Sequence, residues 1–425
     1  MLKRITIDNF KSLIDFQFPP KDEDVLGKLV CIVGLNGSGK STILQALDFL
    51  RQLTVGGMSE WLKARDWSKA DLSSKGRRRN LITFQIEMET AFGELTWGGS
   101  FNTQLLRCTS ESLQIKANEE FDSFVKSEII KLESGEISIS SNDRKFPVTF
   151  KYEGSVFSQF QADNVSGNAS LAKIILDISL EGIKSLELLS PNLMRKPSRD
   201  AVDIGVGGEH LAAFIDGLSF DSKKQLTEKL KIFYPKISKV TSKSTKYGWR
   251  RLYVTEDYGD GMETEARHVN DGLLRLLSIL AQTIAEPGVA KQIRSKALSD
   301  AERKDLGSLA HKFYDLILLD EIENGINPEL MDKLVNYLLT VRQQVILTTH
   351  SPMLLNYLPD TVAVDSVFFL FRNKSGAVRC RRLFSVERMK EKLEIMGPGE
   401  AFADTGLELL SSDLASEDAA KLKDE

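Results

Sequence analysis

Short, wholly apolar runs stand at both ends of this chain. Residues 29–33, 316–319 and 344–347 are each apolar or nearly so, which predicts strands buried on both faces, as in a parallel sheet. Directly after the first run, apolar residues recur at helical spacing (Ile43, Leu44, Leu47, Leu50, Leu53). The pattern predicts an α/β fold in two lobes, one from each end of the chain.

The middle of the chain follows a different pattern. Between residues 80 and 160, short β-like runs alternate with turns, which predicts an antiparallel sheet with a last strand over 148–152. A helix over 121–133 is predicted to interrupt this sheet, and residues 171–234 read as largely helical. Nowhere is there a heptad repeat long enough for a long coiled coil.

These patterns predict a division into four parts: 1–100 and 266–372 as the two lobes, 101–265 as a β and helical insertion, and 373–425 as an extension. The extension opens with a basic strand-like segment, 378–383, and ends in an acidic tail. We expect the last dozen residues to be disordered, since they are acidic and carry no aromatic residue.

A glycine-rich loop joins the first apolar run to the predicted helix. Its sequence is Gly34-Leu35-Asn36-Gly37-Ser38-Gly39-Lys40-Ser41, the spacing of a phosphate-binding loop in the expected strand–loop–helix context. Glycines allow successive backbone N–H groups to surround a polyphosphate at a helix N-terminus. Lys40 is predicted to reach the β- and γ-phosphates and Ser41 to coordinate Mg²⁺, whereas a chance glycine-rich turn is the alternative. The predicted nucleotide-binding residues are Gly34, Asn36, Gly37, Ser38, Gly39, Lys40, Ser41 and Thr42.

Adjacent carboxylates end the second apolar run. Asp320 and Glu321 follow Leu319, so a buried strand would deliver both to its carboxyl end. Asp320 is predicted to hold Mg²⁺ through water, and Glu321 to polarise the water that attacks the γ-phosphate. The third apolar run leads to His350, which could sense the γ-phosphate or simply belong to a loop.

Composition limits the remaining classes. The 425 residues suggest two or three domain-sized units, and no apolar run approaches the roughly 20 residues that cross a bilayer. The N-terminus has no secretory pattern, and the three cysteines show no metal-ligand spacing, so we expect a cytoplasmic protein whose metal is the Mg²⁺ of a nucleotide. A net charge of −4 does not favour nucleic acid, but basic stretches at 75–79 and 236–251 are candidate DNA contacts; each could equally be a solvated face.

Taken together, these motifs resemble those of the ABC-type ATPase superfamily, in the branch of RecF, SMC-like and OLD-like ATPases. The N-terminal Asn9-Phe10-Lys11-Ser12-Leu13 and the segment Asp320 to Pro328 match elements of that branch, although Asn327 replaces its more usual His or Asp. The resemblance implies an ABC-ATPase head with a mixed, largely parallel P-loop sheet and an adjoining antiparallel β subdomain. It is weakest at the signature motif, where Asn270, Asp271 and Gly272 would press on the γ-phosphate bound by a second copy; a plain helix cap is the alternative.

The resemblance also implies a function. It indicates ATP and Mg²⁺ as ligands, ATP hydrolysis, and a homodimer or a higher oligomer built of dimers. The segment 396–402 is similar to the end of AAA-21-like ATPases encoded beside nuclease partners in bacterial anti-phage systems, which favours a sensor or scaffold that controls an effector protein. Only about 75 residues follow His350, and they contain no Asp-x-Asp, so no fused TOPRIM nuclease domain is expected. A RecF-like DNA-repair ATPase is the alternative, and a transporter ATPase is disfavoured because no Gln-loop is recognisable.

Overall fold

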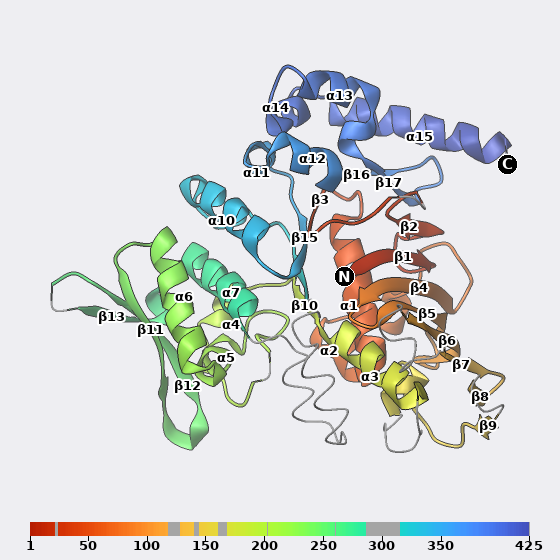
Figure 1. Ribbon diagram of the computed structural model, residues 1–425, viewed down its shortest axis with the longest axis horizontal. Helices are drawn as coiled ribbons and strands as arrows, with labels where there is room; N and C mark the ends of the chain where they lie inside the picture. Colours follow the sequence, from red (N-terminus) through yellow and green to blue (C-terminus); the bar gives the residue numbers. More distant parts are fainter. Residues whose placement is uncertain are drawn as a thin grey trace.

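The computed structural model describes residues 1–21, 24–117, 128–139, 144–159, 168–201, 203–259, 261–285 and 315–424. Three sheets and the helices around them build the chain (Figure 1). Among the described residues, no helix is both long and apolar enough to span a membrane.

A six-stranded sheet lies at the centre of the fold. Its strand order is β10-β14-β15-β3-β16-β17, and all neighbours are parallel except the last pair. The three predicted apolar runs are adjacent strands of this sheet, as expected. The strands are β3 (Leu29–Gly34), β10 (Ile183–Leu186), β14 (Leu316–Leu319), β15 (Gln344–Thr348), β16 (Val367–Arg372) and β17 (Val378–Arg382).

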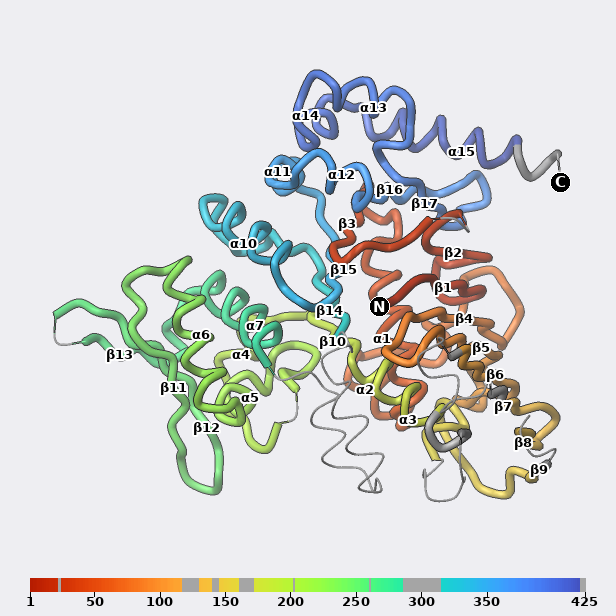
Figure 2. Tube along the Cα trace, viewed as in Figure 1, coloured from red at the N-terminus to blue at the C-terminus, as the bar shows by residue number. Residues whose placement is uncertain are grey.

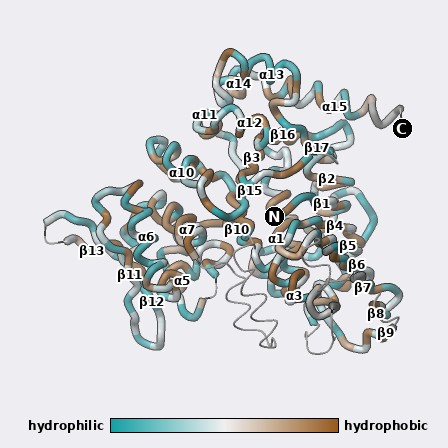
Figure 3. Tube along the Cα trace, viewed as in Figure 1, coloured by the Kyte–Doolittle hydropathy of each residue, from teal (hydrophilic) through white to brown (hydrophobic). Residues whose placement is uncertain are grey.

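The two faces of this sheet belong to different hydrophobic cores. Val30 and Ile32 pack in one core with helix α1 (Lys40–Val55), helix α3 (Asn168–Glu181) and the second sheet. Cys31 and Val33, on the opposite face, pack with helices α7 (Asp271–Ile284) and α10 (Pro328–Thr340). Figure 3 shows hydrophobic residues concentrated on α3 and α7. The central sheet is therefore covered on both faces, which explains the apolar runs in β3, β14 and β15.

The second sheet has eight antiparallel strands in the order β2-β1-β4-β5-β6-β7-β8-β9. The proposed boundary near residue 100 falls inside β5, so the sheet runs across it. Gln344 ties this sheet to the central one, because its side chain accepts from Leu2 N (2.7 Å) and donates to Leu2 O (3.1 Å). The strands are β1 (Leu2–Asp8), β2 (Phe16–Phe18), β4 (Leu81–Thr90), β5 (Gly93–Asn102), β6 (Arg107–Ala117), β7 (Glu128–Glu133), β8 (Glu136–Ile139) and β9 (Arg144–Pro147).

The remaining elements form two peripheral groups. A three-stranded sheet, β11 (Ile237–Ser244), β12 (Arg250–Glu256) and β13 (Met262–Glu265), packs on helices α5 (Leu211–Gly217) and α6 (Phe220–Phe233). The second group consists of the helices that follow β15 and β17 in the chain, which lie near β16 and β17 of the central sheet (Figure 1). The other helices are α2 (Met58–Ala64), α4 (Pro191–Met194), α11 (Pro352–Asn356), α12 (Asp360–Ser366), α13 (Glu387–Leu393), α14 (Pro398–Ala403) and α15 (Leu407–Asp424).

Several local predictions are wrong. Residues 128–133 form strand β7 instead of the end of a helix, because Ile130 and Leu132 point into the core beside β6; residues 121–127 lie outside the described residues. Residues 148–152 are not a strand, and β10 was missed inside a region read as helical. The acidic tail is helical through Asp424, since Leu410 and Leu414 bury one face of α15.

A short helix explains the segment 396–402 in structural terms. Asn356 Oδ1, on α11, accepts from the backbone N–H of Gly399 (2.8 Å) and of Glu400 (3.1 Å) at the start of α14. A Cβ at Gly399 would lie 1.9 Å from Pro352 O, so only glycine allows this approach. The motif therefore joins α14 to the helix that follows His350.

Glu111 supplies a pH-dependent stability term in the second sheet. It is buried on β6, where Val156 N (2.7 Å) and Trp97 Nε1 (3.2 Å) donate to it, and burial raises its pKa to about 7. Because the folded-state pKa lies above the unfolded value, the native state holds the proton more tightly, so this contribution is present at low pH and is lost as pH rises towards 7.

Replacing Glu111 with Gln should remove this titration. The free energy of unfolding of the native chain relative to Glu111→Gln should fall between pH 5 and pH 8, by on the order of 3 kcal/mol at most. Urea unfolding of both proteins at the two pH values measures this, because titrations elsewhere cancel in the difference. An unchanged difference would show that Glu111 titrates normally.

Candidate functional site

The glycine-rich loop has the predicted strand–loop–helix setting. It runs from the end of β3 to Lys40, the first residue of α1, and Gly34, Gly37 and Gly39 all have positive φ. A Cβ at Gly34 would lie 2.5 Å from Leu370 O of β16. The loop thus depends on glycine both for its backbone conformation and for its contact with the neighbouring strand. Asn36 and Ser38 lie within this loop, and Ser41 and Thr42 in the first turn of α1.

The charged groups of the site meet at the carboxyl ends of the central strands. Lys40 is buried, and its Nζ donates to Gly34 O (2.9 Å) and Leu35 O (3.2 Å) of its own loop. Burial lowers the pKa of Lys40, and the carboxylates of Glu321 and Asp320 oppose that shift. The lysine is thus held beside both acidic residues, ready to exchange carbonyl partners for phosphate oxygens.

Asp320 and Glu321 are organised by Thr348, at the end of the adjacent strand β15. The Thr348 hydroxyl donates to Asp320 Oδ1 and accepts from the Glu321 backbone N–H (2.9 Å). Ser41 also hydrogen bonds Asp320, whose pKa is raised by burial against these contacts. Glu321 has a left-handed backbone (φ 44°), a strained conformation that is typical of functional sites. Sequence reasoning missed the role of Thr348, since only strand pairing places it between the two acids.

His350 lies beside a third acidic residue. Glu323 Oε1 accepts from the His350 backbone N–H (2.9 Å) and lies 3.1 Å from His350 Nδ1, while half of the His350 side chain is exposed. Glu323 therefore fixes the imidazole, a role that sequence reasoning did not assign. The spacing of Glu323 in the segment 320–328 was the available signal.

The predicted signature residues stand apart from the phosphate loop of the same chain. Asn270 caps α7 by accepting from Leu273 N (2.8 Å), and Arg195 Nη2 pairs with Asp271 Oδ1 (2.6 Å). A Cβ at Gly272 would lie 2.2 Å from Gly325 O, in the loop after Glu321. Within the described residues, no hydrogen bond or ion pair joins Asn270, Asp271 or Gly272 to the loop at 34–42.

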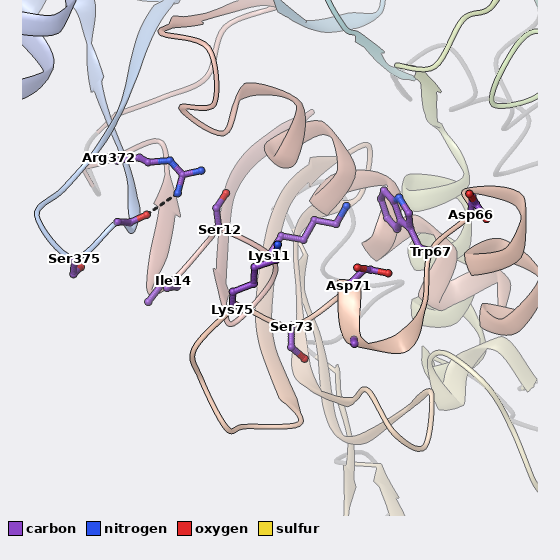
Figure 4. A pocket seen from close by; sticks show the side chains of 12 residues that line it. Lys11, Ser12, Ile14, Asp66, Trp67, Asp71, Ser73, Lys75, Arg372 and Ser375 are labelled. Carbon is purple, nitrogen blue, oxygen red and sulfur yellow. Dashed lines mark hydrogen bonds between the residues drawn. The ribbon is translucent and has the colours of Figure 1, made fainter.

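A cavity of about 630 Å³ adjoins the phosphate loop (Figure 4). Arg372 connects the two, because its Nε donates to Gly37 O (2.8 Å) while its side chain lines the cavity. On the opposite wall, Lys11 Nζ lies 3.1 Å from the centroid of the Trp67 ring. Burial lowers the pKa of Lys11 to about 8. The cavity has the size of a small-ligand site and combines an aromatic face with charged groups.

Behind that wall lies a buried ionic cluster, here called the Arg65 cluster: Arg65, Asp48, Glu187 and Trp61. Arg65 is fully buried, donates to Asp48 Oδ2 (2.6 Å) and pairs with Glu187 Oε1. Trp61 Nε1 also donates to Asp48 Oδ2 (2.9 Å). Burial raises the pKa of Glu187 to about 7.

Strand pairing places one member of the Arg65 cluster, Glu187, at the same edge of the sheet as Asp320. Glu187 follows β10, whose last residue Leu186 pairs with Leu319, so Glu187 stands next to Asp320 at the same sheet edge. Sequence reasoning could not find it, because β10 itself was read as part of a helical region.

The donor set fits a magnesium–nucleotide complex. Ser41 and Asp320 offer the oxygen ligands that Mg²⁺ prefers, and the buried Ser38 Oγ has no hydrogen-bond partner among the described residues. No group of three or more His, Cys, Asp or Glu residues in the described part of the chain could hold a metal by itself. A bound metal would therefore share its coordination with phosphate oxygens and water.

The fold and this site define an ATPase of the ABC/AAA class, in the SMC/OLD branch. The family model described as "AAA domain, putative AbiEii toxin, Type IV TA system" matches residues 29–105 and 113–356, more than half of the chain. The chain belongs to this family.

Similarity to individual proteins is more limited. The chain is 33% identical over 109 residues to the OLD nuclease of Thermus scotoductus (strain ATCC 700910 / SA-01), a match that covers 26% of this chain but only 18% of that nuclease. Its fold resembles the "SmcHead bound to the C-winged helix domain of ScpA" with TM-score 0.50 and 13% identity, over 89% of this chain and 97% of the other. An SMC head from Pyrococcus furiosus gives TM-score 0.47 and 11% identity, over 92% and 99% of the two chains.

Proposed function

We propose that this protein binds Mg-ATP and hydrolyses it to ADP and phosphate. The observation that carries the proposal is the meeting of Lys40, Ser41, Asp320 and Glu321 at one edge of the central sheet. In this arrangement Lys40 and the loop N–H groups would bind the β- and γ-phosphates. Ser41 and Asp320 would hold Mg²⁺, which neutralises developing phosphate charge.

Glu321 is the proposed general base. It would accept a proton from the attacking water as the water oxygen bonds the γ-phosphorus and the bond from that phosphorus to the bridging β–γ oxygen breaks. Asn324 Nδ2 donates to Glu321 Oε2 (2.6 Å), which leaves the other carboxylate oxygen for water. His350, oriented by Glu323, would contact the γ-phosphate. The adenine base and the ribose of ATP would occupy the cavity between Trp67 and Arg372.

A second copy of the chain completes the proposed site. Asn270, Asp271 and Gly272 make no hydrogen bond or ion pair with the glycine-rich loop of their own chain among the described residues, which supports a role for them at the γ-phosphate held by a partner. Gly272 packs on the loop that follows Glu321, which would couple the contact with the partner to the position of the catalytic base.

At the level of biology, we propose a cytoplasmic sensor or scaffold that controls an effector, such as a nuclease or toxin, in anti-phage defence. The description of the family and the partial likeness to an OLD nuclease support this role. The junction of α11 and α14 offers a route from His350 to the C-terminal helices, where a partner could detect the nucleotide state.

Replacing Glu321 with Gln tests the proposal. The variant should hydrolyse ATP at least about 100-fold more slowly yet bind it, because amide and carboxylate have the same shape but only the carboxylate accepts the proton. Single-turnover assays measure the hydrolysis rate. Mass determination of the ATP-loaded variant shows whether ATP is bound and how many copies the complex contains, and two copies are expected. Hydrolysis at the native rate would exclude Glu321 as the base.

Co-purification with the products of neighbouring genes tests the effector, and a preparation that yields the ATPase alone would contradict that role.

A further inference from the structure

The hairpin formed by β11 and β12 projects from the body of the protein, well away from the nucleotide site (Figure 2). Its tip, residues 245–249, carries two aromatic side chains: Tyr247 is 86% exposed and Trp249 is 45% exposed. Tyr247 also has a left-handed backbone (φ 63°), a conformation that residues with a side chain rarely adopt. Burial within this chain therefore does not explain why aromatic residues stand at this tip.

A segment distant in sequence adds positive charge to the tip. Ser198 and Arg250 exchange backbone hydrogen bonds (3.1 and 2.8 Å), so residues 195–199 run beside the hairpin. The side chain of Arg199 lies beside Gly248, within 3.6 Å of the position of a Cβ there. Arg199 pairs with its neighbour Asp200 (3.1 Å), whereas Lys196 and Lys246 are exposed and have no ion pair among the described residues.

Part of the positive charge on the rest of this sheet is balanced by acidic side chains. Lys243 pairs with Glu263, Arg251 pairs with Glu265 (3.4 Å), and Arg250 pairs with Asp216 (2.8 Å). Three of the six basic residues in the stretch 236–251 are thus ion-paired, while Lys236, Lys239 and Lys246 have no ion pair among the described residues. The tip differs from the rest of the described sheet in carrying two exposed aromatic rings, with the unpaired Lys246 next to them in sequence.

We propose that this tip, defined by Lys196, Arg199, Lys246, Tyr247 and Trp249, binds single-stranded nucleic acid. Lysine and arginine contact phosphates, and aromatic rings accept unpaired bases of any sequence by stacking. Duplex bases are already stacked and offer no such face. The tip lies outside the nucleotide site, so this activity is independent of the proposed ATPase function.

Fluorescence anisotropy with labelled oligothymidylate and oligouridylate tests the proposal, with the matching duplexes as comparison. Replacing Tyr247 and Trp249 with Ala together should weaken single-strand binding by about tenfold or more, from typical stacking energies. Replacing Lys246 with Glu should lower both the affinity and its dependence on salt, since each phosphate contact contributes about 0.7 to the logarithmic slope for single strands.

Tyr258 supplies the matched control. It is also an exposed tyrosine (61%), on the turn between β12 and β13, with Lys236 Nζ 5.6 Å from its ring centroid. Tyr258→Ala should bind single strands as the native chain does, and every variant should keep native ATP affinity. Equal losses from Tyr258→Ala and from the tip variants, or tighter binding to duplex than to single strands, would overturn the proposal. Equally effective competition by polyglutamate, which has charge but no bases, would do the same.

Discussion

Replacing Lys40 with Ala is expected to abolish ATP hydrolysis, with a loss of 1,000-fold or more, and to weaken nucleotide binding severely. Lys40 is buried beside Asp320 and Glu321, and the carboxylates of both residues act on its charge. Its charge is held in place by two loop carbonyls before any ligand arrives. Electrostatic stabilisation from such a fixed group is strong because no reorganisation is needed during the reaction.

Nucleotide binding by calorimetry and hydrolysis by phosphate release measure this effect. Lys28→Ala is a suitable control, because Lys28 is exposed just before the other end of the same strand, β3. The control should behave as the native protein in both assays. If Lys40→Ala retains native ATP affinity, the loop at 34–42 is not the phosphate site, and the proposed function fails with it.

Replacing Arg65 with Ala is expected to destabilise the protein by about 3–5 kcal/mol, because it leaves the buried Glu187 without its cation and Asp48 with only the longer pair to Arg51 (3.8 Å). Asp48 and Glu187 have side chains that are 2% and 1% exposed, so water cannot replace the guanidinium. Trp61 and Trp67 would also lose contact, since each ring centroid lies 4.9 Å from the Arg65 guanidinium carbon. The loss should loosen Glu187 next to Asp320 and so lower ATP affinity.

Chemical denaturation of Arg65→Ala and of Arg77→Ala provides a matched comparison. Arg77 also pairs with an aspartate, Asp8 (2.7 Å), but their side chains are 34% and 25% exposed. The Arg77 pair should contribute no more than about 1 kcal/mol, as surface pairs do. Similar costs for both substitutions would show that the Arg65 cluster is not an essential part of the core.

The elements that were predicted correctly are those whose structure depends on residues close together in sequence. Strand β3, the glycine-rich loop and α1 follow one another without a break, so spacing and periodicity sufficed to predict them. The apolar runs that became β14 and β15 were equally clear, because strands covered on both faces are composed mainly of apolar residues. By contrast, 128–133 was assigned wrongly because its structure depends on pairing with β6, a strand distant in the local pattern, and 148–152 because this segment belongs to no described strand.

The sequence by itself determined the α/β class, the glycine-rich loop between β3 and α1, and the two acidic residues after β14, because each depends on residues adjacent in the chain. Only the tertiary structure decided that Thr348 bridges Asp320 and Glu321, that Glu187 follows β10 to the same sheet edge, and that residues 195–199 run beside the hairpin tip. Those arrangements arise from strand register and from the packing of segments far apart in sequence. Hydrophobic periodicity records which face of an element is buried, but it does not record what that face is buried against.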